Sequence, residues 1–144
     1  MQENIDKSGL SISHEVTTPA RGNLFDVDGE SPLLEGKEFE IFQRDVAKLI
    51  YIAIRAHLDM LLPVAFLCTR VTKRKKQDQT KCKHSLEYVK GSIDSVYSKG
   101  AKSLNKIQSW VDTAYAVHPN MESHPGGVSS IGLGGFMGKS TNHN

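Results

Sequence analysis

The hydrophobic periodicity of this chain changes near Gly91, and this change constrains the fold more than any other sequence feature. Before Gly91, apolar residues recur every three or four positions, which is typical of amphipathic helices. Beyond it the period becomes two, which is typical of half-buried strands. We therefore expect an α+β fold in which a helical segment of about three helices precedes a β-hairpin.

The first helix is expected to begin near Glu38, because an apolar face starts there. That face comprises Phe39, Phe42, Val46, Leu49, Ile50 and Ala53. A second helix is expected from Asp59, as its N-cap, to about Val71, with Pro63 tolerated in the first turn, where backbone donors are unpaired. A continuous, kinked helix is the alternative.

A third helix is expected from Asp78 to Lys90, and Gly91 is suited to end it. Two strands of a hairpin are predicted at 107–117 and 128–136, with a loop at Pro119–Gly126 between them. The glycines near the end of the second segment are interpreted as bends within that strand. A single hairpin is marginally stable, which favours a domain that is cut short.

Charge and composition divide the chain further. Ten of the 16 acidic residues lie in residues 1–45, and 14 of the 18 Lys and Arg residues follow them. Residues 1–36 are rich in Ser, Thr, Gly, Pro and acids, so we expect an extended segment that covers a partner surface or lacks a fixed structure. We divide the remainder into a helical region, 37–100, and a strand region, 101–144.

Three features bear on the compartment and on membrane association. Cys68 and Cys82 lack the spacing of a disulfide framework or a zinc ribbon, so reduced thiols are expected. The amino terminus lacks the basic and apolar regions of a secretory signal. The longest apolar run, Met60 to Cys68, is far shorter than the roughly 20 residues that span a bilayer. We expect an intracellular protein, cytoplasmic or nuclear and not secreted, without a membrane partner.

Asp112 is the first candidate for chemistry. Asp is depleted in strand interiors, yet this residue lies between Val111 and the strand-like run Thr113–Val117. A carboxylate buried there needs an interaction that offsets the cost of its desolvation. A divalent cation such as magnesium could provide that interaction, since it binds carboxylate oxygens together with substrate phosphates. A structural ion pair or a strand-end Asp is the alternative.

The segment Trp110–Gly127, WVDTAYAVHPNMESHPGG, resembles the opening of the ribonuclease H domain in copia-type (Pseudoviridae-like) retrotransposon polyproteins. The family pattern there is W-x-D-A-x-[FY]-A-V-H-P-D-M-x-S-H-T-G-G, from which this chain departs at Asn120 and Pro125. Upstream, the segments TTPARGNLFDVDGESPLL, KEFEIFQRDVAKLIYIAIR and LPVAFLCTRVT are similar to the region that joins the polymerase palm to ribonuclease H. The resemblance covers about residues 17–140.

This resemblance implies a retrotransposon reverse transcriptase/ribonuclease H polyprotein, with RNA-directed DNA synthesis and RNA/DNA hybrid hydrolysis in the full-length family. Residues 37–100 would be a thumb or connection-like region, and Asp112 would be a catalytic magnesium ligand within a ribonuclease H-like domain. The polymerase motif Tyr-x-Asp-Asp does not occur in the sequence, and Glu122 is the only acid after Asp112. We therefore expect a polyprotein fragment that is catalytically incompetent alone and binds no magnesium by itself.

A basic run is the second candidate site. It comprises Lys73, Arg74, Lys75, Lys76, Lys81 and Lys83. These cations could neutralise the phosphates of an RNA/DNA hybrid or template-primer, which would make binding strongly dependent on salt. A solvated charge run or a localisation signal are the alternatives. If the run does bind nucleic acid, the chain could instead be a non-catalytic, basic helical nucleic-acid-binding module.

His118 and His124 are the third candidate site. Zinc requires three or four ligands, and no spacing in this sequence completes such a set. Hydrogen bonding that shapes the loop is the favoured interpretation for both residues. The resemblance places this loop beside the ribonuclease H active site.

Overall fold

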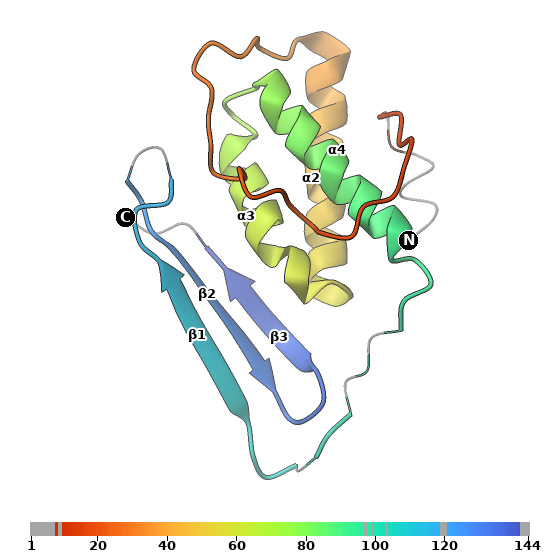
Figure 1. Cartoon of the computed structure of the whole chain (residues 1–144), viewed down its shortest axis with the longest axis vertical. Coiled ribbons are helices and arrows are strands. Elements are labelled where there is room, and N and C mark those ends of the chain that lie inside the picture. Colours follow the sequence, from red (N-terminus) through yellow and green to blue (C-terminus); the bar gives the residue numbers. More distant parts are fainter. Residues whose placement is uncertain are drawn as a thin grey trace.

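The computed structural model describes residues 8, 10–96, 98, 100–102, 104–118 and 121–141. Within these residues, three α-helices and a short 3-10 helix precede a three-stranded antiparallel sheet, so the chain is of the α+β class (Figure 1). The elements are α2 (Gly36–Arg55), η1 (Leu58–Met60), α3 (Leu61–Arg70), α4 (Lys76–Gly91), β1 (Gln108–Ala114), β2 (His124–Ser130) and β3 (Gly135–Ser140). Within the described residues, none of these helices combines the length and the apolar character that crossing a membrane requires.

The core lies between the three helices. Helix α2 buries Phe42, Val46 and Leu49, which confirms the predicted apolar face, although Ile50 on the same helix is 36% exposed. Cys82, Leu86 and Val89 on α4 are fully buried against this face, as are Met60 and Leu67 from the second helical segment. Non-directional burial of these apolar side chains is the dominant force holding the bundle together.

The second helix begins differently from the prediction. Asp59 lies within η1 and does not cap α3, whose N-cap residue is Met60 without a side-chain hydrogen bond. The Asp59 carboxylate instead accepts a hydrogen bond from the hydroxyl of Tyr88 on α4. Pro63 falls in the first turn of α3, as predicted, and Ala56 and His57 separate α2 from η1. The alternative of one continuous helix is therefore wrong.

The segment formed by residues 18–35, called here the amino-terminal strap, packs on the chain's own helices. It runs across α3 and α4 in Figure 1, and Leu24 and Leu34 within it are buried. Leu33 forms an isolated antiparallel bridge with Lys75 at the start of α4. Residues 1–36 were expected to cover a partner or to lack a fixed structure, but in the described part of this segment Leu34 belongs to the chain's own core and the Phe25 ring lies 5.3 Å from that of Phe66.

The carboxy-terminal sheet has the order β1-β2-β3. The predicted first strand is confirmed as β1, but the predicted second strand is two strands, because the chain turns between Ser130 and Gly135. Gly132 lies in this turn, where a Cβ atom would be 2.2 Å from the carbonyl oxygen of Gly100, so the close approach there requires a glycine where a single bent strand was expected. Residues 119 and 120 of the predicted loop lie outside the described residues.

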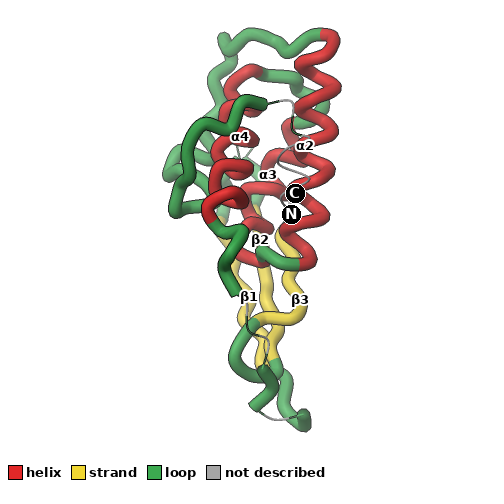
Figure 2. The backbone as a smooth tube through the Cα atoms, turned by 90° about the vertical axis from the view of Figure 1, so that its right-hand side faces the viewer, coloured by secondary structure: helices red, strands yellow, loops and turns green. Residues whose placement is uncertain are grey.

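The sheet lies beside one end of the helical bundle, with β3 against η1 and α3 (Figure 2). Gly138 makes this close approach possible, because a Cβ atom there would lie 2.5 Å from Cδ1 of Leu61. Strand β1 is on the far edge, and all seven of its residues are exposed. Among the described residues, the sheet thus has β3 against the helices and no strand paired with the outer edge of β1.

Candidate functional site

Asp112 lies in the middle of β1, opposite Gly126 of β2. Its side chain is exposed, and its Oδ1 atom accepts a hydrogen bond from the backbone N–H of Thr113 at 2.8 Å. The expectation of a buried carboxylate is therefore wrong. The physical reason is that β1 is an edge strand, and the glycines opposite its centre carry no side chains that would cover it.

A hollow of about 360 Å³ adjoins Asp112 between β1, β2 and the start of α3. Asp59 also lines this hollow, but its carboxylate accepts a hydrogen bond from Tyr88 and lies 3.5 Å from Nδ1 of His57. Among the described residues, no group of three or more His, Cys, Asp or Glu side chains is placed to hold a metal ion. These residues do not by themselves fit a two-metal centre, which needs several bridging carboxylates.

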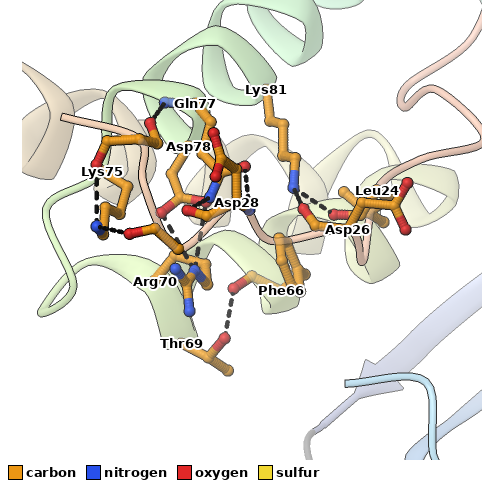
Figure 3. Close-up of polar contacts among 12 residues, drawn as sticks. Leu24, Asp26, Asp28, Phe66, Thr69, Arg70, Lys75, Gln77, Asp78 and Lys81 are labelled. Atoms are coloured by element: carbon orange, nitrogen blue, oxygen red, sulfur yellow. Dashed lines mark hydrogen bonds and ion pairs between the residues drawn. The ribbon is translucent and has the colours of Figure 1, made fainter. Parts of the chain in front are cut away.

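The basic run lies where the strap meets α4, and Figure 3 shows several of its contacts. The Lys75 ammonium donates to the carbonyl oxygens of Gly29 and Ser31 at 2.8 and 2.9 Å. The Lys81 ammonium donates to the carbonyl oxygen of Leu24 at 2.8 Å and to that of Asp26. Burial is the main cause that lowers the pKa of Lys81. Both lysines therefore hold the strap against α4.

Arg74, Lys76 and Lys83 of the run also contact this chain, whereas the Lys73 residue is exposed. The Arg74 guanidinium lies over the Phe39 ring, with its central carbon 4.2 Å from the ring centroid. Lys76 pairs with Glu38 at 3.8 Å, and Lys83 pairs with Glu87 at 3.9 Å. These contacts give most of the run a structural role in the helical region, which was not among the alternatives expected from the sequence.

Arg70 and Asp78 form a buried ion pair beneath the strap (Figure 3). The Nε atom of Arg70 lies 3.3 and 3.1 Å from the two carboxylate oxygens of Asp78, whose side chain is fully buried. Burial raises the pKa of Asp78, while the Arg70 charge opposes that shift. Neither residue was among the site residues predicted from the sequence.

His118 and His124 are both buried and hydrogen-bonded to each other, which confirms the predicted structural hydrogen bonding. Nε2 of His118 lies 2.7 Å from Nδ1 of His124, and Nε2 of His124 lies 2.6 Å from the hydroxyl of Ser140 on β3. Their exposed fractions are 4% and 3%. Ser140 was not expected beside the two histidines, because the strand that carries it was not predicted.

Aromatic rings from the strap and α3 fix this pair of histidines. The Phe25 ring lies edge-on to His118, with centroids 5.1 Å apart, and Phe66 stacks on the same imidazole at 5.7 Å. Burial lowers the pKa of His118 and of His124, and the neighbouring His118 lowers that of His124 further. Both imidazoles are therefore neutral near pH 7.

We compared the chain with known protein families, with curated proteins and with solved structures. None of the three comparisons gives a match. The functional assignment therefore depends on the residues and geometry described above.

Proposed function

We propose that this chain is the segment of a copia-type retrotransposon polyprotein that joins the reverse transcriptase to the ribonuclease H domain. In this proposal, helices α2 to α4 form the connection, and β1 to β3 are the first strands of a ribonuclease H-like sheet. The substrate of the whole protein would be an RNA/DNA hybrid. By itself the chain has no ribonuclease H activity, because one carboxylate cannot bracket two metal ions.

The position of Asp112 carries this proposal. Its carboxylate is exposed at the centre of β1 and lines a hollow large enough for a metal ion and a phosphate. Among the described residues, no strand pairs with the outer edge of β1. That edge presents unpaired backbone groups on which a further strand could add. A strand added there would bring its own side chains beside Asp112.

Magnesium, when bound, would activate the attacking water and stabilise the charge that develops on the scissile phosphate. Asp112 is the one residue of this chain that we assign to holding it. The carboxylate is held in place by the Thr113 amide and by the backbone pairing of β1 with β2. The other ligands would come from sequence beyond these three strands.

The basic run gives less support to the alternative of an independent nucleic-acid-binding module. Lys75 and Lys81 each donate two hydrogen bonds to backbone carbonyl oxygens of the strap, so two of the three donors on each ammonium are already used within the chain. Filter binding to an RNA/DNA hybrid across a salt series distinguishes the two functions. A loss of affinity of about 10³-fold or more between 50 and 200 mM salt would favour the module.

The direct test is activity of the product of the complete open reading frame that contains this chain. We expect magnesium-dependent cleavage of the RNA strand of a hybrid, and we expect Asp112→Asn to lower the rate by at least about 100-fold, as loss of a metal ligand typically does. Asp94→Asn, which changes an exposed Asp outside the sheet, is the matched control. Equal cleavage rates in the Asp112→Asn and parent proteins would overturn the proposal.

A further inference from the structure

The hydrogen-bonded series Ser140–His124–His118 has the arrangement of a nucleophile, a general base and a group that orients the base. We propose that it forms a second, hydrolytic site, in which Ser140 attacks carboxylic esters. The proposal uses different side chains and a different reaction from the ribonuclease H assignment, so either can fail without the other, although both make use of the hollow beside β1.

The distances fit this chemistry. Ser140 Oγ and His124 Nε2 are 2.6 Å apart, within the range for direct proton transfer between a nucleophile and its base. On its other side, Nδ1 of His124 is 2.7 Å from Nε2 of His118. Such sites are defined by geometry and by the role of each group, whatever the order of the residues in the chain.

The tautomer that this site needs is compatible with the hydrogen bonds. If Nδ1 of His124 carries the proton and donates it to Nε2 of His118, then Nε2 of His124 is an acceptor for the Ser140 hydroxyl. His118 thus acts as a positioning residue. The Phe25 and Phe66 rings pack against its imidazole and limit its rotation.

Substrate has access to the nucleophile. Ser140 is partly exposed and lines two neighbouring hollows, one of about 360 Å³ beside β1 and one of about 410 Å³ along α2 and α3. The first hollow is lined mainly by apolar side chains, among them Leu58, Leu61, Leu62, Trp110 and Val128. A hollow of this size and character fits an ester with a short apolar acyl group.

The reaction is balanced without a cofactor. Ser140 Oγ bonds to the ester carbonyl carbon, while its proton moves to His124 Nε2. The bond between that carbon and the alcohol oxygen then breaks, and the alcohol leaves with the proton. Water next attacks the acyl-serine and passes its proton through His124 to Ser140 Oγ. The net change is ester plus water to carboxylic acid plus alcohol.

The test uses the unmodified chain and two probes. A fluorophosphonate is incubated with the protein, and the labelled residue is located by peptide mass spectrometry. Hydrolysis of p-nitrophenyl butyrate is measured for the parent, for Ser140→Ala and for the matched control Ser129→Ala, whose hydroxyl bonds Ser109 on another part of the sheet. We expect label on Ser140 and a loss of about 100-fold in kcat/KM in Ser140→Ala alone, the scale of one proton-transfer catalyst.

The positioning role of His118 is tested by two further variants. His118→Gln keeps an acceptor for the His124 N–H, whereas His118→Phe keeps only the ring packing. We expect His118→Gln to retain hydrolysis within about threefold and His118→Phe to lose about tenfold or more at equal thermal stability. Absence of label on Ser140, together with equal hydrolysis in the parent and Ser140→Ala, would overturn the proposal.

Discussion

The Lys81 ammonium lies 2.8 Å from the carbonyl oxygen of Leu24, a residue 57 positions earlier in the chain. The same ammonium lies 4.9 Å from the centroid of the Phe66 ring. One side chain of α4 therefore contacts both the strap and α3. Hydrogen bonds from a charged donor contribute about 1.5–3 kcal/mol each, so this contact is a main determinant of where the strap lies.

Loss of the Lys81 ammonium should release the strap. We expect Lys81→Ala to raise the rate of tryptic cleavage after the exposed Arg21 by about tenfold or more, because cleavage follows the population of the open segment. Lys83→Ala is the matched control, since that lysine pairs with Glu87 on its own helix. Equal cleavage rates in the two variants would contradict the assigned role of Lys81.

The buried pair of Arg70 and Asp78 should be sensitive to loss of one partner. We expect Asp78→Ala to lower the free energy of unfolding by about 3–5 kcal/mol, because Arg70 would be left as an uncompensated, largely buried charge. The exposed pair of Lys76 and Glu38 is the comparison, and Lys76→Ala should change stability by less than about 1 kcal/mol. Urea unfolding measures the free energy of unfolding of both variants. Similar losses in Asp78→Ala and Lys76→Ala would contradict burial as the reason for the larger loss expected at Asp78.

Gly132 should not accept a side chain. A Cβ atom there would lie 2.2 Å from the carbonyl oxygen of Gly100 and 2.5 Å from the backbone nitrogen of Lys102. Because these are backbone atoms, we expect Gly132→Ala to destabilise the protein by about 1–3 kcal/mol, or to speed hydrogen exchange at the amides of Lys102 and Leu133. Gly126→Ala, where the nearest atom is 3.6 Å away, is the control and should be nearly neutral.

The buried histidines should make the protein sensitive to acid. Burial lowers the pKa of His118 and His124 in the folded state, so below the unfolded value of about 6.5 the unfolded chain binds more protons. The two neutral, buried histidines therefore contribute fully to the free energy of unfolding above pH 6.5. This contribution is lost as the pH falls from 6.5 through their lowered pKa values in the folded state. Urea unfolding at pH 7.5, 6.5 and 5.5 should show this loss, and His118→Gln should show a smaller one. An unchanged stability from pH 7.5 to 5.5 would contradict the assigned burial.

The helices were predictable because their apolar faces are formed within one element. Helix geometry places apolar residues that recur every three or four positions on one face. This spacing explains the buried face of α2 and the burial of Cys82, Leu86 and Val89 in α4. The observed helix α4 spans Lys76–Gly91, where Asp78 to Lys90 was predicted, a difference of the size usual at helix ends.

Long-range contacts explain what the sequence did not predict. The strap is polar in composition, but its carbonyl groups are bound by Lys75 and Lys81, which lie more than 40 positions away. The burial of Asp112 was overestimated because periodicity does not distinguish an edge strand from a central one. Ser140 belongs to a candidate site only because β3 pairs with β2 and brings it to His124.

The most direct measurement is the sequence of the transcript on both sides of this reading frame. The proposed function predicts in-frame coding for Tyr-x-Asp-Asp upstream and for Ser-Thr-Glu-Ala-Glu downstream, which would make Asp112 one of several metal ligands in a longer protein. Unrelated coding sequence on both sides would contradict the assignment of this chain to a reverse transcriptase/ribonuclease H polyprotein.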